Sequence, residues 1–397
     1  MLTLDGGKRL VFLGLWGATF ACMFGDTIPQ SFQPLFLASL GISPAAIGLV
    51  YNIRNVVQTF LRLFAGGLSD ALGRRRVIMA GLALITLVPF MYAASTDLWL
   101  PLAAMFVSGV GQSIFFPPVE SYASSLYPPE QAGKAMGRFH TSWAMSSVLG
   151  PAAGGFLALA YPDYRSLFLL AGVVTGTSLI IFRVMAGGGG PERVKPVSAG
   201  ALIRGFPATL QRMSRNRRVV AGSLSVFVHA FCHWGIPAYL PLYAAGLGLN
   251  EAAIGLALTA NALVYGAAMP LVGSVSDRIG RFPPVIVGVA GSVAVFALFP
   301  SATSVYTLVA TNAALGLCAA LEFPISQALT MEALPEEERG TAAGVWGMMM
   351  NLGGTLGLFG MSFIVSTMPL ESVFYFCAVF SLISAVVLVA MRGYFSM

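Results

Sequence analysis

The sequence predicts an all-α membrane protein with twelve transmembrane helices in two pseudo-symmetric six-helix bundles, and with both termini cytoplasmic. Three observations predict this class: an apolar composition, an internal repeat and a one-sided distribution of basic residues. Of the 397 residues, 57% are hydrophobic and 10% are charged, and the mean hydropathy is +0.80. Because soluble domains carry about 25% charged residues, this composition requires a lipid environment.

Apolar stretches of about 20 residues indicate the individual membrane spans. Twelve such stretches are centred near residues 23, 55, 86, 112, 147, 175, 231, 262, 292, 318, 353 and 382. The polar run AGGGGPERVKPVSAG interrupts the pattern after the sixth stretch. We therefore predict an N-terminal bundle over residues 1–185, a cytoplasmic linker over 186–217 and a C-terminal bundle over 218–397.

The two halves repeat one another at a constant distance. Five residues of the run GGLSDALGRRRV recur 207 positions later: Gly66, Ser69, Asp70, Gly73 and Arg74 reappear as Gly273, Ser276, Asp277, Gly280 and Arg281. The same shift, without a gap, pairs Pro34 with Pro241 and Gly150 with Gly357. A register that holds over this length indicates a duplicated unit.

The basic residues predict the orientation and exclude other partners. With the N-terminus inside, all Lys and Arg outside the spans are cytoplasmic except Arg165. The positive-inside rule thus accounts for the net charge of +6, and we expect no nucleic-acid partner. We expect a monomer in a prokaryotic cytoplasmic membrane, with a small-molecule substrate and membrane lipids as partners. All four cysteines fall within predicted spans, so we expect no disulfide framework.

A short loop between the second and third spans resembles a family signature. Its Gly73 permits a tight turn, and Asp70 can accept hydrogen bonds from loop donors. The run GGLSDALGRRRV resembles the loop signature of the major facilitator superfamily, and VGSVSDRIGR at 272–281 resembles its second copy, although Ala71 stands where the family has a basic residue. The resemblance implies two rocking bundles, with gating loops at Gly66, Asp70, Gly73, Arg74, Gly273, Asp277, Gly280 and Arg281.

The fifth span carries a second pattern. Its small residues recur every four positions, which lets another helix approach closely, and ordinary helix packing would explain them as well. Gly137, Gly150, Pro151, Gly154 and Gly155 together resemble the antiporter signature of the superfamily. This resemblance implies export by exchange, driven by an ion gradient, commonly of protons, with no cofactor. The arginine that drug:proton antiporters usually carry in the fourth span is replaced by Met105, so proton coupling must use other groups.

Polar and charged side chains inside the spans are the candidates for substrate binding or proton coupling, because a charge at mid-bilayer normally faces a partner or a wet cavity. The candidates are Asp26, Arg54, Gln58, Arg62, Glu120, His140, His229, His233 and Glu322. Arg54, Gln58 and Arg62 follow one another at intervals of four and line one helix side. Static ion pairs that only support packing are the alternative reading of these groups.

The second half differs from the first at several of these positions. Asp26 aligns with His233, and Arg54 aligns with Asn261. Such asymmetry is expected where a site is specialised. Two histidines without further ligands are weak evidence for a metal, so we predict no metal site and favour proton exchange by histidine.

The leading functional hypothesis is a secondary active transporter that works by alternating access and exports an amphipathic or organic small molecule in exchange for protons. Asp26 or Glu322 would carry the proton. Arg54 would hold Asp26 charged or bind an anionic substrate group. The alternatives are a carrier of a specific organic anion bound by Arg54 and Arg62, and a lipid or lysolipid flippase. The sequence contains no HExxH, GxSxG or Walker-type motif, so we expect neither an enzyme nor ATP drive.

Overall fold

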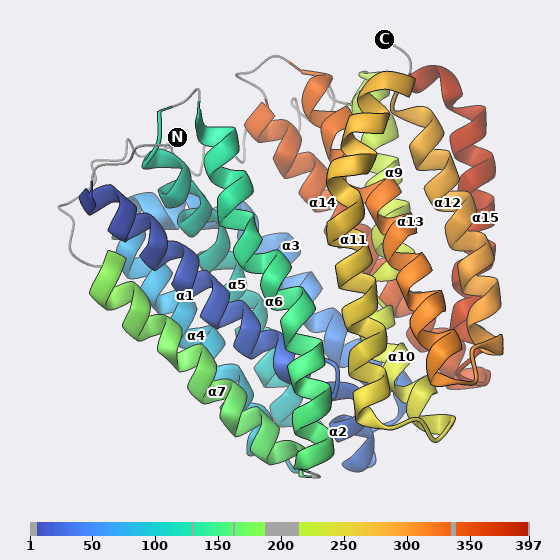
Figure 1. Ribbon diagram of the computed structural model, residues 1–397, viewed down its shortest axis with the longest axis horizontal. Coiled ribbons are helices and arrows are strands. Elements are labelled where there is room, and N and C mark those ends of the chain that lie inside the picture. The colour runs from blue at the N-terminus through green and yellow to red at the C-terminus, as the bar shows by residue number, and fades with distance from the viewer. Residues whose placement is uncertain (1–5, 129–130, 162, 187–213, 335–338, 396–397) are drawn as a thin grey trace. The chain divides into compact units, whose positions relative to one another are not determined.

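The computed structural model describes residues 6–128, 131–161, 163–186, 214–334 and 339–395. Within these ranges the side chains of residues 62–67, 70, 71, 132 and 339–341 lie outside the description. All regular secondary structure in the described residues is helical (Figure 1). The predicted all-α class is therefore confirmed.

The described helices match the predicted membrane spans. Eleven segments are long and apolar enough to cross a membrane, by length and composition. Each coincides with a predicted span, and the remaining predicted span, near residue 55, falls on α3 (Pro44–Leu72), a helix of 29 residues. Every predicted span thus corresponds to a helix in the structure.

The first compact unit consists of Met1–Phe32 and Val57–Leu202. It contains the later part of α3 together with α1 (Gly6–Gln30), α4 (Arg74–Ala93), α5 (Trp99–Ser125), α6 (Ala132–Ala160), α7 (Tyr164–Ile181) and a π-helical turn (Phe182–Ala186). α1 packs against α6 and α7, and α4 packs against α5 and α7. Its core includes the fully buried Leu15, Phe115, Phe139 and Phe182.

The second compact unit consists of Gln33–Val56 and Ile203–Met397. Besides the first part of α3 it contains α2 (Gln33–Ser39), α9 (Arg217–His233), α10 (Ile236–Gly246), α11 (Glu251–Ile279), α12 (Phe282–Leu298), α13 (Val305–Glu332), α14 (Arg339–Thr367), α15 (Ser372–Ala390) and two short 3-10 turns (Phe299–Ser301 and Arg392–Tyr394). α13 packs against α9, α11 and α12, and α9 also packs against α14.

The predicted N-terminal bundle, residues 1–185, includes a segment that the structure groups with the second unit. Gln33–Val56 groups with the second unit, whereas the predicted boundary places it in the N-terminal bundle. The predicted linker, 186–217, falls almost entirely on residues outside the described part of the chain.

Two of the predicted spans are broken rather than continuous. α1 ends at Gln30 and α2 follows from Gln33, while α9 ends at His233 and α10 follows from Ile236. Pro34 and Pro237 stand in the first turns of α2 and α10. A proline lacks the amide proton for the preceding turn, and its ring meets the carbonyl four residues earlier, so it favours a break at these points, whereas α5 and α13 continue through their prolines. The carbonyls in question belong to Gln30 and His233, the last residues of α1 and α9.

Turn glycines repeat with the same spacing as the sequence. Among the described residues, the positive backbone φ angles belong to Gly41 (79°), Gly73 (88°), Gly248 (76°) and Gly280 (89°). These form two pairs, each separated by 207 positions. Gly73 and Gly280 connect α3 with α4 and α11 with α12, where a residue with a Cβ atom would be strained. The tight turn predicted at Gly73 is thus present in both halves.

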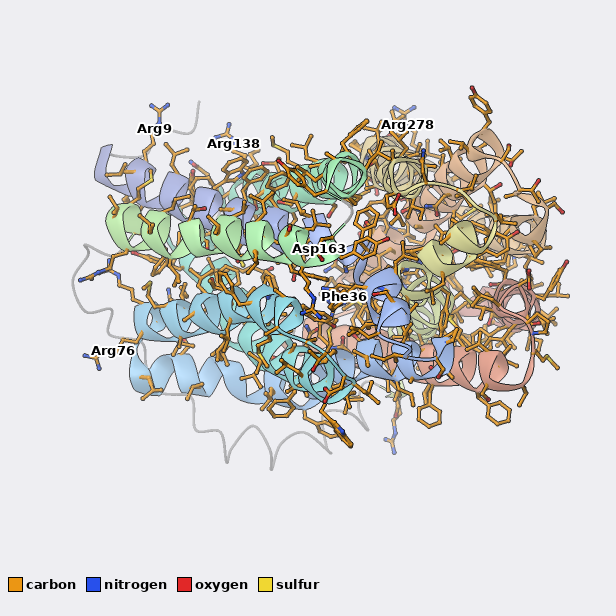
Figure 2. All side chains as sticks on the ribbon, turned by 90° about the horizontal axis from the view of Figure 1, so that it is seen from below. Arg9, Phe36, Arg76, Arg138, Asp163 and Arg278 are labelled. Carbon is orange, nitrogen blue, oxygen red and sulfur yellow. The ribbon has the colours of Figure 1, made fainter. Side chains whose placement is uncertain are left out.

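The outer faces of the helices are apolar. Ile180 on α7, Leu271 on α11 and Val386 on α15 have 64%, 68% and 65% of their surface exposed. Large exposed apolar surfaces are unusual on a soluble monomer, and here they suit contact with lipid. Charged groups lie at other positions: Figure 2 shows the side chains of Arg9, Arg76 and Arg138 pointing away from the helices of the first unit.

Candidate functional site

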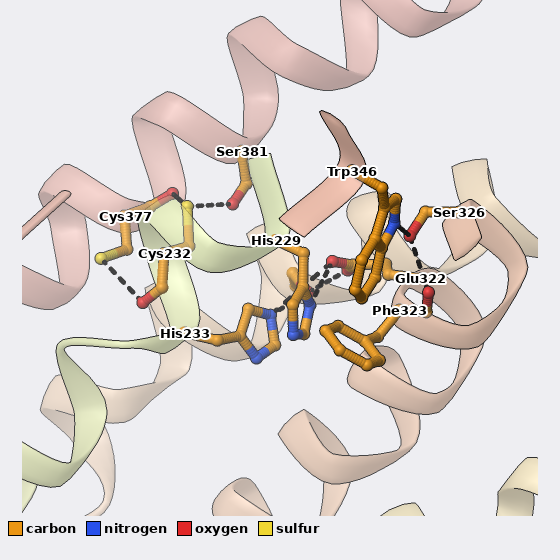
Figure 3. A network of polar contacts seen from close by, with 10 residues as sticks. His229, Cys232, His233, Glu322, Phe323, Ser326, Trp346, Cys377 and Ser381 are labelled. Atoms are coloured by element: carbon orange, nitrogen blue, oxygen red, sulfur yellow. Dashed lines mark hydrogen bonds and ion pairs between the residues drawn. The ribbon is translucent and has the colours of Figure 1, made fainter. Parts of the chain in front are cut away.

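A buried polar cluster in the second unit brings together three of the predicted site residues (Figure 3). His229 and His233 are one turn apart on α9, and Glu322 lies on α13. The Oε2 atom of Glu322 is 3.1 Å from His229 Nδ1 and 3.8 Å from His233 Nε2. The two imidazole rings stack with their centroids 4.2 Å apart. Both histidines therefore share one helix face and meet the same carboxylate oxygen.

Ser292 on α12 completes this cluster. Its hydroxyl donates a hydrogen bond of 2.8 Å to Glu322 Oε1 and lies 3.4 Å from His233 Nε2. One turn earlier on α12, Gly288 leaves room for the acid, because a Cβ atom there would lie 2.8 Å from Glu322 Cγ. Ser292 was not among the predicted residues. The repeat aligns Ser292 with the apolar Ile85, and this polar-for-apolar difference is the feature of the sequence that could have identified it.

The cluster is shielded from solvent. The side chains of Glu322, His229 and His233 are 2%, 8% and 9% exposed. A buried carboxylate is costly unless its oxygens have partners, and here both oxygens have them. Aromatic rings form part of the wall: Phe323 lies 5.3 Å from the His229 ring and Phe296 lies 5.5 Å from the His233 ring. The arrangement can hold a single positively charged species where the histidines and the acid converge.

A second polar network occupies the first unit. Gln112 on α5 donates through Nε2 to Asp26 Oδ2 at 3.5 Å and to Ser108 Oγ at 3.4 Å. Gln58 on α3 donates to Gln112 Oε1 at 2.8 Å. The structure thus connects Asp26 and Gln58, two predicted site residues, through Gln112, which sequence reasoning missed. The repeat aligns Gln112 with Ala319, so a polar residue in one half stands opposite an apolar residue in the other. This difference could have identified Gln112 from the sequence.

The predicted arginines and the acid–histidine pair have different surroundings. Arg54 falls in the segment that groups with the second unit, and the side chain of Arg62 lies outside the described residues. His140 Nε2 on α6 is 3.6 Å from Glu120 Oε1 on α5, with side chains 54% and 38% exposed. This pair is partly open, unlike the buried cluster around Glu322.

The glycines of the antiporter-like pattern form the contact between α6 and α1. A Cβ atom at Gly150 would lie 2.6 Å from Thr27 Cβ, and one at Gly154 would lie 3.1 Å from the carbonyl carbon of Ile28. Thr27 Oγ1 donates to the Ser146 carbonyl at 3.0 Å across the same contact. Gly137, by contrast, has open space around it. Pro151 and Gly155 are buried on the same helix.

The second copy of the loop motif, at 273–281, carries a network of charges. Arg281, between α11 and α12, is 2.7 Å from Asp277 Oδ1 and donates to Ser276 Oγ at 2.6 Å. It also donates from Nε and Nη2 to the two carboxylate oxygens of Glu332 at the end of α13. Partial burial by itself would lower the pKa of Arg281, but the hydrogen bonds and charges of Glu332 and Asp277 raise it above its ordinary value. The guanidinium group therefore stays charged and ties the loop to α13.

The first copy of the loop motif, at 66–74, is described only in part. Arg74 donates to Ser125 Oγ at 3.3 Å, and the 207-residue shift aligns Ser125 with Glu332. The side chain of Asp70, together with Gly66, lies outside the described residues. Arg74 and Arg281, which are equivalent in the repeat, thus contact equivalent positions at the ends of α5 and α13. Among the described contacts, the residue at this helix end is Glu332 in the second half and Ser125 in the first.

Comparisons with known proteins agree with this architecture. The family model of the Major Facilitator Superfamily matches residues 15–252 and 222–394. An uncharacterised MFS-type transporter of Methanocaldococcus jannaschii is 22% identical over 389 residues, which are 96% of this chain and 97% of the relative. The quinolone resistance protein NorA of Staphylococcus aureus is 27% identical over 165 residues, 42% of this chain and 39% of the relative.

The fold is also that of solved transporters. The crystal structure of a bacterial homologue of the human lysosomal transporter Spinster, in an inward-facing and unoccupied conformation, superposes with a TM-score of 0.83. The sequence identity is 13%, and the match covers 99% of this chain and 98% of the other. The chain therefore belongs to the Major Facilitator Superfamily, and it is a multi-pass membrane transporter rather than an enzyme.

Proposed function

We propose that this transporter exports an amphipathic organic small molecule in exchange for protons, and that Asp26 carries the proton. The observation that carries the proposal is the position of this acid. Asp26 receives the Gln112 amide from α5 and directly precedes Thr27, which contacts Gly150 of the antiporter-like pattern. One acidic group thus adjoins both a polar network and the helix contact formed by that pattern.

The network suits a group that changes its protonation state. A glutamine side chain can donate to a carboxylate through Nε2 or accept from a carboxylic acid through Oε1. Gln112 therefore offers Asp26 a partner in both states, and it also accepts a hydrogen bond from Gln58 and donates one to Ser108.

The helix contact offers a way to couple the proton to movement. Gly150 and Gly154 allow the backbones of α6 and α1 to approach at Thr27 and Ile28. A change of charge at Asp26 acts on the residue next to this contact and so favours one packing of α1 on α6 over another. Substrate and proton then occupy the transporter alternately, which produces exchange.

The similarity to NorA supports the direction and the substrate class. That relative is named for quinolone resistance, and the similarity covers 42% of this chain. We also propose that the protein is a monomer in a prokaryotic cytoplasmic membrane, with both termini cytoplasmic. It is driven by the proton gradient without a cofactor, and its partners are the small-molecule substrate and membrane lipids. A fluorescent protein fused after Met397 should fold and fluoresce, whereas a periplasmic terminus would leave it dark.

Transport in proteoliposomes tests the proposed carrier. Ethidium, an amphipathic fluorescent cation, serves as the probe, and its movement is followed after a pH gradient is imposed. We expect Asp26→Asn to abolish gradient-driven movement and to preserve exchange between labelled and unlabelled ethidium, because the neutral amide cannot release a proton. Glu120→Gln is the matched control, since that acid belongs to a partly exposed pair, and it should retain gradient dependence.

Two outcomes would contradict the proposal. Gradient-driven movement by the Asp26→Asn protein within about twofold of wild type would remove Asp26 from the coupling step. Wild-type protein that carries ethidium equally well with and without a pH gradient would refute proton exchange itself.

A further inference from the structure

We propose that His229, His233 and Glu322 form a binding site for a divalent transition-metal ion such as Zn²⁺ in the second unit. The sequence alone offered two histidines, which are too few for a stable site. The fold adds a carboxylate, so that three ligand atoms lie within 4.8 Å of one another. This inference uses different residues from the proposed proton carrier, and neither depends on the other.

The distances fit a metal ion. Zn²⁺ binds histidine nitrogen and carboxylate oxygen at about 2.0–2.1 Å in a tetrahedral arrangement, which separates neighbouring ligand atoms by roughly 3.3 Å. In the structure Glu322 Oε2 is 3.1 Å from His229 Nδ1 and 3.8 Å from His233 Nε2. These two separations lie within about half an ångström of the tetrahedral value, and the two histidine nitrogens, which lie within 4.8 Å of each other, would turn toward the ion to complete the set.

The two histidines are placed as a ligand pair. Residues four apart on a helix lie on the same face, one turn above the other. His229 presents Nδ1 and His233 presents Nε2 to the same carboxylate oxygen, so the different ring nitrogens compensate for the step along α9. Two histidines at this spacing on one helix, joined by a ligand from another element, are a recurrent zinc-binding arrangement.

Ser292 orients the third ligand. Its hydroxyl holds Glu322 Oε1 at 2.8 Å. The other carboxylate oxygen, Oε2, faces His229 and His233 (Figure 3). Partners that hydrogen-bond a ligating carboxylate fix its orientation and affect the affinity for the metal. Oε1 of Glu322 thus accepts the hydrogen bond from Ser292, and Oε2 binds the ion.

The donor set selects the class of ion. Two imidazole nitrogens and one carboxylate oxygen suit Zn²⁺, Co²⁺ or Ni²⁺, whereas Mg²⁺ and Ca²⁺ prefer sites made of oxygen alone. Three protein ligands leave a coordination position for water or another molecule, which is typical of exchangeable rather than closed structural sites. The bound ion would link α9 to α13.

The repeat shows that the set is particular to the second half. Under the 207-residue shift His229, His233, Ser292 and Glu322 align with Cys22, Asp26, Ile85 and Phe115. All four positions differ between the halves. A cluster that only filled space between helices would not require polar groups at all four positions together.

Metal binding to the purified full-length protein tests the site. After treatment with a chelator and its removal, the protein in detergent is titrated with ZnCl₂ by calorimetry, and bound zinc is measured by elemental analysis. We expect wild type to bind a single Zn²⁺ ion per chain and to gain thermal stability, because the ion binds the folded state. Co²⁺ in place of Zn²⁺ should produce visible absorption bands of a four- or five-coordinate ion.

Matched variants connect the binding to these residues. His233→Gln and Glu322→Gln should weaken Zn²⁺ binding by at least tenfold, and Ser292→Ala should weaken it by roughly 10- to 100-fold. His140→Gln removes the remaining histidine of the chain, which has three, and should leave binding unchanged. Melting curves recorded in excess chelator identify any variant that fails to fold.

Three results would overturn the proposal. Wild-type protein that binds no stoichiometric Zn²⁺ would leave the cluster as a hydrogen-bonded network only. Equal affinity in wild type and in folded Glu322→Gln would exclude the carboxylate as a ligand. If His140→Gln lost as much Zn²⁺ affinity as His233→Gln, the binding would be assigned to the exposed His140 rather than to this site.

Discussion

Replacing Gly150 by alanine should force α1 and α6 apart. The added Cβ atom would lie 2.6 Å from Thr27 Cβ and 3.2 Å from the Thr27 carbonyl carbon, and it would also meet Thr27 Oγ1. Carbon atoms in contact prefer separations of about 3.5–4.0 Å. The two helices must therefore separate by about 1 Å at this point. The hydrogen bond from Thr27 Oγ1 to the Ser146 carbonyl, now 3.0 Å long, lengthens with them.

The expected cost follows from these distances. Thr27 cannot yield by turning its side chain alone, because its backbone carbonyl carbon is also too close. Overpacking of this kind typically costs about 1–3 kcal/mol. The intrinsic preference of helices for alanine over glycine offsets roughly 0.5–1 kcal/mol of that cost. We expect Gly150→Ala to lower the free energy of unfolding by about 1 kcal/mol, within a range of roughly 0–2.5 kcal/mol.

Gly137→Ala is the control on the same helix. Apart from its own helix backbone, no described atom lies within 4 Å of the position that its Cβ atom would occupy, so the helix preference dominates and stability should be unchanged or higher. Unfolding of both proteins is followed by circular dichroism in mixed micelles with increasing dodecyl sulfate. Equal stability of Gly150→Ala and Gly137→Ala would refute the close α1–α6 contact, whatever the absolute values.

Two arginines provide further predictions, each tested by the same unfolding assay. Arg281→Lys keeps the charge but loses the forked guanidinium group that reaches Ser276 and Glu332 together. We expect the free energy of unfolding to fall by about 0.5–1 kcal/mol. An equal loss in Arg278→Lys, whose side chain is exposed, would argue against the network. Arg165 donates from two different nitrogens to the carbonyls of Ala93 and Ser95 at the end of α4. Arg165→Lys should cost about 1–2 kcal/mol, because lysine has a single nitrogen on a shorter side chain in place of these two. Unchanged stability would mean that Arg165 serves orientation alone.

Features that depend on consecutive residues were predictable. Span positions follow from the hydropathy of each stretch, and the turn at Gly73 follows from the freedom of glycine to adopt a positive φ angle. The breaks after Gln30 and His233 follow from proline chemistry, although a count of apolar residues overlooks them. The repeat predicted that Gly280 would turn like Gly73, and the two φ angles, 89° and 88°, agree.

Contacts between distant helices were harder to predict. The candidates Asp26 and Glu322 were found because an acid in a span is conspicuous, whereas Gln112 and Ser292 were missed because neutral polar residues are common in such helices. Their alignment with Ala319 and Ile85 was visible in the repeat, but it gave no indication of which acid each would contact. The partners became apparent only once α5 was placed beside α1 and α12 beside α13.

The sequence by itself determined the membrane class, the duplicated architecture and the set of polar groups that lie within the spans. These properties reside in composition, in periodicity and in the register between the halves. Only the tertiary structure decided that His229, His233 and Glu322 converge and that Ser292 turns one carboxylate oxygen toward the histidines. The reason is physical: the rotation of each helix about its axis depends on side chains packed from other helices. Glycines such as Gly288 set how closely those helices approach.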